Sequence, residues 1–199
     1  MPQKQSKREV RAAVIDRRRG MSISRRQGDT QALLMHLPQI AQTNAAGDPA
    51  TAITVCAYVP IGTEPGSPQM LDRLVELGFR VLLPVTHADE PLGWGDYRAN
   101  TLVDAEFGLR EPARPHLPPA TIALAQAILV PALAVDRRGV RLGRGAGFYD
   151  RSLPLAAPDA ARIAVVYDED LVDQLPTEAH DVPMTHAFTP GLGLIELGS

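Results

Sequence analysis

Four short apolar segments alternate with helix-forming segments along this chain, and this alternation is the feature that most limits its possible folds. The apolar segments are Ala52–Val59, Phe79–Pro84, Ala127–Val130 and Ile163–Tyr167. Continuous apolar runs of this length are typical of strands buried on both faces of a parallel sheet. Gln69–Leu77 joins the first two segments and has the apolar spacing of an amphipathic helix. We therefore predict an α/β fold with three layers.

Two helices are predicted near the N-terminus. Apolar residues at helical spacing predict the first helix over residues 5–19. Ser22 or Ser24 can cap a second helix that continues to about residue 42. Pro38 is expected to bend or restart this second helix, because proline cannot donate the backbone hydrogen bond of a helix interior.

The remaining segments predict shorter elements. Residues 86–119 are rich in proline, glycine and turn residues, which favours short strands or hairpins. Asp136–Arg138 is expected to form a hairpin turn, and Gly147–Leu155 a helix. Near the C-terminus, His186–Phe188 and Leu192–Leu197 are expected to add edge strands.

A glycine-rich loop that carries arginines follows the third apolar segment. Gly143, Gly145 and Gly147 alternate with other residues, and Arg141 and Arg144 flank them. Glycines let backbone N–H groups approach a phosphate, and a helix that begins after the loop adds partial positive charge. The loop lacks the lysine of a P-loop and the longer dinucleotide fingerprint, so an ordinary strand-to-helix turn is the alternative.

The loop is part of a longer motif, R-L-G-R-G-A-G-F-Y-D over residues 141–150. This motif resembles the R-L-G-x-G-x-G-[FY]-Y-D signature of the 5-formyltetrahydrofolate cyclo-ligase family, also called methenyltetrahydrofolate synthetases. The resemblance implies a three-layer α/β/α sandwich with a mostly parallel sheet, related to the ribose-phosphate isomerase and CoA-transferase architecture. It also implies a single domain over residues 1–199. The implied reaction is the ATP- and Mg²⁺-dependent cyclisation of 5-formyltetrahydrofolate to 5,10-methenyltetrahydrofolate, which releases ADP and phosphate.

The resemblance implies an ATP site built from the N-terminal helix, residues 1–19, and the glycine-rich loop. Family members carry K-x-x-x-R on the first helix, and Lys7 and Arg11 match this spacing on one helix face. Lys4 and Arg8 are alternatives in a shifted register, and exposed surface charges are the alternative without a ligand. The residues implied to bind ATP are Lys7, Arg11, Arg141, Gly143, Arg144, Gly145, Ala146, Gly147, Phe148 and Tyr149.

A second group of residues is implied to bind the folate. Glu64 follows the first apolar segment, and a carboxylate can accept two hydrogen bonds from an aminopyrimidine edge. Phe107 is implied to stack on the flat ligand. A solvent-exposed turn carboxylate and a core aromatic residue are the respective alternatives. The residues implied to bind folate are Val59, Glu64, Phe107, Arg144, Phe148 and Tyr149.

Asp150 and Asp181 are the implied Mg²⁺ ligands. Two carboxylates, together with phosphate oxygens and waters, can complete the octahedral shell that Mg²⁺ requires. Asp168 also follows an apolar segment and is a further candidate for this site. The residues implied to be catalytic are Arg144, Tyr149 and Asp150.

The chain departs from the family pattern at two positions. Relatives carry a C-terminal motif L-P-x-x-x-x-D-x-P-[ML]-D, which residues 175–184 match and in which Thr185 replaces the final aspartate. Ala146 stands where many relatives have lysine or glycine. A lysine at position 146 could contact phosphate, so its absence is expected to lower the affinity for ATP.

Composition limits the cellular setting and the partners. The chain has 199 residues and one cysteine, Cys56, so neither a disulfide framework nor a zinc motif is possible. It shows neither a signal peptide nor an apolar run long enough for a membrane span, and we expect a cytoplasmic protein without a membrane partner. We also expect a monomer or weak dimer.

Charge is distributed unevenly. The net charge is −3, although residues 1–26 contain nine basic and two acidic residues. The basic segment fits a solvated surface, a nucleic-acid arm or one edge of a polyanion site. We expect no nucleic-acid partner. Two other functions stay open: a non-catalytic homologue that binds folate, nucleotide or RNA, and an enzyme similar to sugar-phosphate isomerases or CoA transferases.

Overall fold

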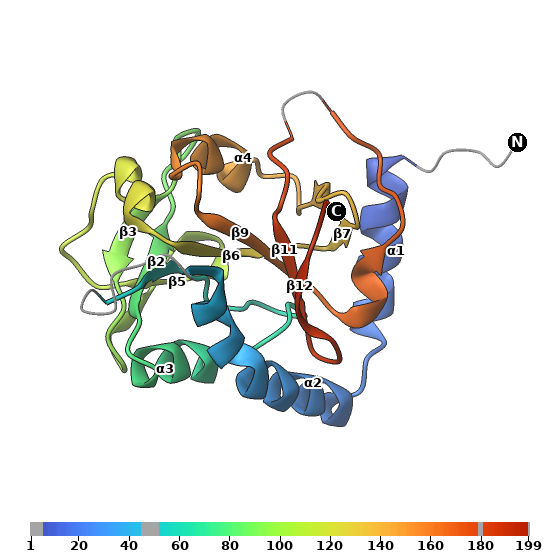
Figure 1. The fold of residues 1–199 in the computed structure, drawn as a ribbon, viewed down its shortest axis with the longest axis horizontal. Coiled ribbons are helices and arrows are strands. Elements are labelled where there is room, and N and C mark those ends of the chain that lie inside the picture. The colour runs from blue at the N-terminus through green and yellow to red at the C-terminus, as the bar shows by residue number, and fades with distance from the viewer. Residues whose placement is uncertain (1–5, 45–51, 179–180, 199) are drawn as a thin grey trace, which may run out of the picture.

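A seven-stranded sheet forms the centre of the protein, and a computed structural model describes residues 6–44, 52–178 and 181–198 (Figure 1). The strand order is β12-β11-β9-β6-β1-β2-β3. Strands β11, β9, β6, β1 and β2 run parallel, whereas β12 and β3 are antiparallel at the two edges. The strands are β1 (Thr54–Cys56), β2 (Arg80–Val85), β3 (Gly93–Asp96), β6 (Ala127–Pro131), β9 (Ala161–Val165), β11 (His186–Thr189) and β12 (Gly193–Glu196). The prediction of a mostly parallel sheet is confirmed.

One face of the sheet is covered by helices from the first half of the chain. These are α2 (Ile23–His36), the 3₁₀ helix η1 (Leu37–Asn44) and α3 (Gln69–Glu76). Their buried leucines, including Leu33, Leu37 and Leu74, pack in one cluster with sheet residues such as Val55 and Leu129. Burial of these apolar side chains fixes all three helices on the sheet.

The other face is covered by shorter elements. These are the 3₁₀ helices η3 (Pro119–Leu124) and η4 (Leu153–Leu155), the helix α4 (Phe148–Ser152), and a small sheet of β7 (Ala134–Asp136), β8 (Arg141–Leu142) and β10 (Leu171–Val172). Ile122 and Leu153 pack with Ile128 and Ala164 of the central sheet. Three layers are therefore present, although this outer layer contains short helices and strands in place of long helices.

Three predicted elements differ from the observed ones. The second helix ends at His36, and the chain continues as the 3₁₀ helix η1 through Pro38. Ser22 is its N-cap, since its Oγ accepts a hydrogen bond from the Arg25 N–H at 3.2 Å. Strand β1 is shorter than the apolar run that contains it. Strand β11 is an internal strand, paired with both β9 and β12, and only β12 is an edge strand.

Two small hairpins complete the fold. Strands β4 (Leu102–Asp104) and β5 (Arg110–Pro112) pair as a two-stranded sheet around the 3₁₀ helix η2 (Glu106–Gly108). Strands β7 and β8 are joined by the turn predicted at Asp136–Arg138. The buried Asp136 carboxylate stabilises that turn, because it accepts hydrogen bonds from the backbone N–H groups of Arg138 and Val140. No helix in these described segments is long and apolar enough to cross a membrane.

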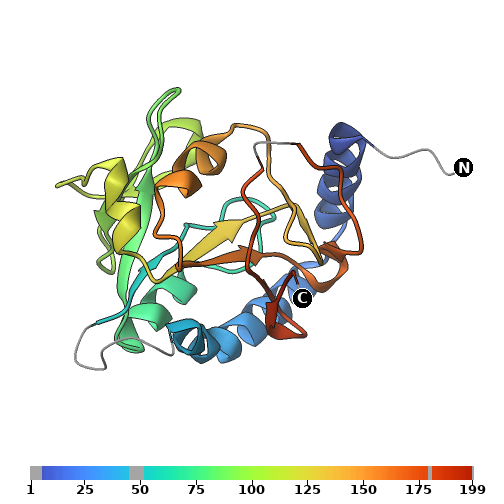
Figure 2. The same ribbon diagram turned by 45° about the horizontal axis from the view of Figure 1, so that its top comes forward.

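Helix α1 (Lys7–Arg19) lies at one end of the molecule, beside β7 (Figures 1 and 2). Ser6 and Glu9 form a capping box that starts this helix. Val10 packs against Ala134 and Leu142 of the small sheet. Helix α1 therefore belongs to neither helical layer of the central sheet.

Arg18 anchors the C-terminal end of α1. Its side chain is buried, and its guanidinium donates to Asp170 Oδ2 at 3.0 Å and to the Ala132 and Leu133 carbonyls at 2.8 and 3.1 Å. Asp170 belongs to the 3₁₀ helix η5 (Asp168–Asp170), and Arg17 contacts its other oxygen. Burial lowers the pKa of Arg18 to about 10, so the side chain stays charged at neutral pH. The ion pair joins α1 to η5, and the two carbonyl contacts join it to the segment that follows β6.

We expect Asp170→Asn to lower the free energy of unfolding by about 3 kcal/mol, because it leaves a buried guanidinium without its counter-ion. The matched control is Asp16→Asn, which removes an exposed ion pair with Arg19 on the same helix and should cost less than about 0.5 kcal/mol. Denaturant unfolding of both variants measures the difference. Equal stabilities would contradict the anchoring role of Asp170.

Candidate functional site

A cavity of about 450 Å³ lies at the carboxyl ends of β1, β2 and β6, where ligands bind in parallel α/β sheets. Its lining residues are Tyr58, Val59, Ile61, Glu64, Pro84, Thr86, Leu92, Leu109, Arg110, Glu111, Pro131, Arg141, Gly143, Arg144, Gly145, Ala146, Gly147, Phe148, Tyr149 and Asp150. Most residues predicted for the ATP and folate sites are therefore brought together in one cavity.

Because ligands bind beyond the carboxyl ends of parallel strands, the sequence predicts three candidate loops, after Val59, Val130 and Tyr167, and one of them does not line the cavity. The loops after Val59 and Val130 do, whereas the loop after Tyr167 does not, and the loop after β2 takes its place. Asp168 binds elsewhere, since its carboxylate accepts hydrogen bonds from Thr189 Oγ1 at 2.5 Å and from the Gly191 N–H at 3.0 Å. These contacts do not support Asp168 as a metal ligand.

The glycine-rich loop has a backbone that other residues would adopt only with strain. Gly145 has φ +101° and Gly147 has φ +73°, both in the left-handed region. A Cβ at Gly147 would also lie 2.7 Å from the Arg151 guanidinium. Residues 143–150 all line the cavity, so this backbone is exposed to a ligand there.

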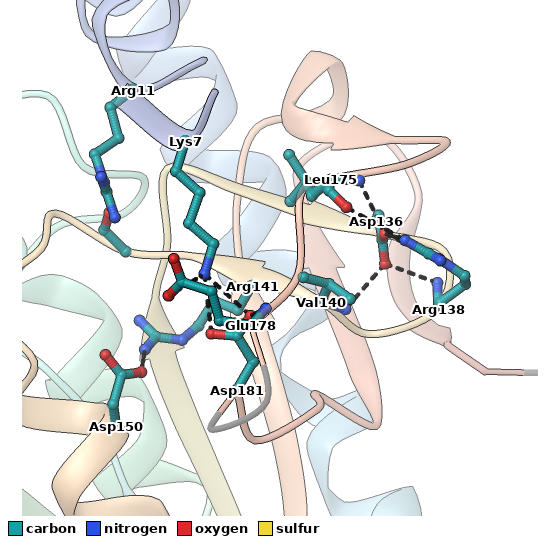
Figure 3. A network of polar contacts seen from close by, with 11 residues as sticks. Lys7, Arg11, Asp136, Arg138, Val140, Arg141, Asp150, Leu175, Glu178 and Asp181 are labelled. Atoms are coloured by element: carbon teal, nitrogen blue, oxygen red, sulfur yellow. Dashed lines mark hydrogen bonds and ion pairs between the residues drawn. The ribbon is translucent and has the colours of Figure 1, made fainter. Parts of the chain in front are cut away.

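The two predicted cations of helix α1 point toward this loop and toward Glu178 and Asp181 (Figure 3). Arg11 Nε donates to the Gly143 carbonyl at 2.9 Å. Lys7, one turn earlier, donates to Asp181 and Glu178 at 3.0 Å. Arg8 is exposed, and Lys4 lies outside the described residues. The register with Lys7 and Arg11 therefore places both side chains on the helix face toward the loop and Asp181.

The pKa of Lys7 reflects two opposing effects. Partial burial of the ammonium lowers this pKa, whereas its hydrogen bonds and attraction to Glu178 and Asp181 raise it. The net pKa is raised. Lys7 is therefore fully charged at neutral pH.

The two predicted metal-binding carboxylates each have a cationic partner. Asp150 Oδ1 lies 2.5 Å from the Arg141 guanidinium, which also lies over the Tyr149 ring at 5.7 Å. Asp181 accepts from Lys7 and from the Glu178 N–H, the latter at 2.8 Å. Within residues 6–44, 52–178 and 181–198, no three acidic, histidine or cysteine residues form a metal-binding group. Asp150 lines the cavity, whereas Asp181 lies beside Lys7, so one Mg²⁺ site shared by both carboxylates stays a prediction.

Glu64 connects the loop after β1 to the glycine-rich loop. Its side chain is only 8% exposed, and its Oε1 accepts from Arg144 Nε at 2.9 Å. Its Oε2 accepts from the Ile61 N–H at 3.0 Å. The backbone of Phe107 lies in η2, but its side chain is outside the described part of the protein, so its stacking role stays a prediction.

Four polar residues of the cavity carry no prediction from the sequence: Tyr58, Thr86, Arg110 and Glu111. Tyr58 donates to the Pro65 carbonyl at 2.7 Å, and burial raises the pKa of its hydroxyl. Thr86 follows the end of β2, so the strand-end rule could have identified it. Glu111 had no such signal, because the β4–β5 hairpin brings it to the cavity.

The two departures from the family pattern lie in different environments. Thr185 Oγ1 accepts from the Arg162 N–H at 2.9 Å, which extends the pairing of β11 with β9 at its amino end. This end of the strands is opposite to the cavity, so Thr185 has a structural role. Ala146 is exposed and lines the cavity beside Gly145 and Gly147.

Comparisons with known proteins agree with this geometry. The sequence model of the 5-formyltetrahydrofolate cyclo-ligase family matches residues 3–190. The chain is 53% identical over 197 residues to a 5-formyltetrahydrofolate cyclo-ligase of Mycolicibacterium smegmatis, covering 96% of this chain and 97% of the relative. It is 29% identical over 143 residues to one of Escherichia coli K12, covering 70% and 79%.

Two solved structures share the fold. An NMR structure of an Aquifex aeolicus 5,10-methenyltetrahydrofolate synthetase superimposes with a TM-score of 0.75 at 24% identity, covering 97% of this chain and 93% of that one. A Mycoplasma pneumoniae 5,10-methenyltetrahydrofolate synthetase gives a TM-score of 0.67 at 20% identity, covering 90% and 96%. Because the family match and the 53% identity both extend over nearly the whole sequence, this chain belongs to the 5-formyltetrahydrofolate cyclo-ligase family.

Proposed function

We propose that this protein catalyses the ATP-dependent cyclisation of 5-formyltetrahydrofolate to 5,10-methenyltetrahydrofolate, with release of ADP and phosphate. The observation that carries the proposal is the meeting of a glycine-rich loop, the cations of α1 and a largely apolar cavity at one sheet edge. The first two suit a polyphosphate, and the third suits a flat heterocycle. The names of the relatives from M. smegmatis and E. coli support the same activity.

The ATP phosphates would bind between α1 and the glycine-rich loop. Lys7, Arg11, Arg141 and Arg144 would neutralise phosphate charge, and the backbone N–H groups of residues 143–147 would donate to phosphate oxygens. Lys7 and Arg141 now pair with acidic side chains, so phosphate would replace those partners. Asp150 and Asp181 would hold Mg²⁺, which supplies further neutralisation of the phosphates when it is bound.

The folate would occupy the apolar part of the cavity. Val59, Phe148 and Tyr149 line that space, and the buried Glu64 would accept hydrogen bonds from the aminopyrimidine edge. Once Glu64 engages the folate, Arg144 would be released to the phosphates. Phe107 would stack on the ring system.

The chemistry requires activation of the formyl oxygen, which is a poor leaving group. Transfer of the γ-phosphoryl group from ATP to this oxygen releases ADP and converts the oxygen into a phosphate ester. The N10 lone pair then forms a bond to the formyl carbon, the C–O bond breaks, phosphate leaves and N10 loses its proton. The protein contributes positioning and charge neutralisation, and no covalent nucleophile is needed. Arg144 and Asp150 would be the residues nearest to the phosphoryl transfer. Tyr149 would contact the folate ring system.

We expect purified protein mixed with 5-formyltetrahydrofolate, Mg²⁺ and ATP to produce the absorbance of methenyl-folate, and no rise without ATP. Asp150→Ala should reduce the rate by about 100-fold or more, because it removes a proposed ligand of the Mg²⁺ that neutralises and orders the phosphates. A folded protein that binds ATP but gives no product would instead be a non-catalytic homologue. Absence of both product and ATP binding would favour a sugar-phosphate or CoA enzyme.

Lys7→Ala should raise the KM for ATP by about tenfold, because it removes a charge-assisted contact to phosphate. The KM for 5-formyltetrahydrofolate should stay unchanged. Arg8→Ala is the matched control, since Arg8 neighbours Lys7 on α1 but is exposed. Steady-state kinetics with each substrate varied measures both constants. Equal effects of the two substitutions would contradict the proposed role of Lys7.

Ala146→Lys should lower the KM for ATP by about two- to fivefold, because an exposed charge on the loop attracts the phosphates by less than about 1 kcal/mol. The gain should shrink at high salt, which screens exposed charges. Ala146→Gln is the control of similar length without charge. A salt-independent gain, or the same gain with glutamine, would contradict an electrostatic cause.

A further inference from the structure

The cavity wall formed by β2 and β5 contains a buried carboxylate that has no role in the proposed reaction. Glu111 lies on β5, is 9% exposed and lines the cavity. Its neighbours in that wall include Pro84, Leu92 and Leu109, which are apolar. A carboxylate in such surroundings requires hydrogen-bond donors, because burial removes it from water.

Thr86 fixes the orientation of the Glu111 carboxylate. Both the backbone N–H and the hydroxyl of Thr86 donate to Glu111 Oε1, at 2.8 and 2.6 Å. None of the residues that the structure describes donates a hydrogen bond to Oε2. This oxygen is also not fully buried, so a ligand in the cavity can reach it. One oxygen is therefore held by the protein, and the other is available to a ligand.

The neighbouring cation does not compensate Glu111. Arg110 is exposed, donates to the Leu102 carbonyl at 3.3 Å and lies 3.9 Å from Asp104. Glu64, the other buried carboxylate of the cavity, differs because Arg144 and Ile61 already donate to its two oxygens, and Asp150 is half-exposed and paired with Arg141. Glu111 is thus a buried carboxylate of this cavity with one oxygen that the described residues leave open.

We infer that Glu111 is a further specificity-determining residue, whose Oε2 accepts a hydrogen bond from an N–H group of the bound folate. This inference rests on the proposed function. Reduced folates present N–H donors on their pterin ring and at N10, whereas their formyl and carboxylate oxygens are acceptors that Glu111 would repel. A buried acceptor rejects a ligand that lacks the matching donor, because the acceptor is then left unpaired. Glu111 therefore selects the orientation of the ring system.

The test measures binding of 5-formyltetrahydrofolate and of ATP separately, by calorimetry, to wild type, Glu111→Gln and Thr86→Val. Glu111→Gln should weaken folate binding by about 10- to 100-fold and leave ATP binding unchanged. Thr86→Val should weaken folate binding less, since the carboxylate remains but loses its orientation. Asp104→Asn is the control, because Asp104 is an exposed carboxylate on the paired strand β4.

Folate analogues that lack the 2-amino group or the N10–H identify the donor. One of these analogues should bind Glu111→Gln about as tightly as it binds wild type, because the analogue and the substitution remove the same hydrogen bond. For that analogue, the two losses of binding free energy are therefore not additive. Wild-type folate affinity in Glu111→Gln, equal losses of ATP and folate binding, or additive losses with every analogue would overturn the inference. Failure of the wild-type protein to bind 5-formyltetrahydrofolate would instead contradict the proposed function.

Discussion

The buried ion pair between Arg18 and Asp170 determines where the N-terminal helix lies, and the proposed ATP site depends on that position. Helix α1 packs on the small β7–β8–β10 sheet and lies outside the central sheet's helical layers. Arg18 ties its last turn to the carbonyls that follow β6. Lys7 is eleven residues earlier, about 16 Å along the helix. A helix fixed at one end by a buried charge can therefore present Lys7 and Arg11 to a loop more than 130 residues away in sequence.

The carboxyl edge of the sheet combines an apolar cavity with a cationic loop, and different elements of the fold supply the two. The ends of β1 and β2 and the β4–β5 hairpin give the apolar walls and two buried carboxylates, Glu64 and Glu111. The hairpin β7–β8 leads into the glycine-rich loop and its arginines. A heterocycle and a polyphosphate can therefore bind next to each other, as a transfer between them requires.

Features that depend on a short stretch of sequence could be predicted before the structure was known. Apolar runs predicted the parallel strands, and the motif over residues 141–150 predicted the loop that lines the cavity. Contacts between residues far apart in the sequence could not be predicted from these local patterns. Arg18 is one of three consecutive arginines, and only the packing of α1 distinguishes it as the buried one. Glu111 reaches the cavity through a hairpin with no motif, and Asp168 follows a strand but caps the β11–β12 turn.

The pairing of the cations around the glycine-rich loop with carboxylates of the same chain has a consequence for ligand selection. Lys7, Arg141 and Arg144 are each neutralised by an acid already within reach. A small anion must compete with a tethered carboxylate, whose effective concentration is high, and it can replace only one such partner at a time. A triphosphate chain displaces several together and gains the sum of their contacts. If ATP binds at these cations as proposed, the resting charge pairs would disfavour inorganic phosphate and other simple anions relative to a polyphosphate.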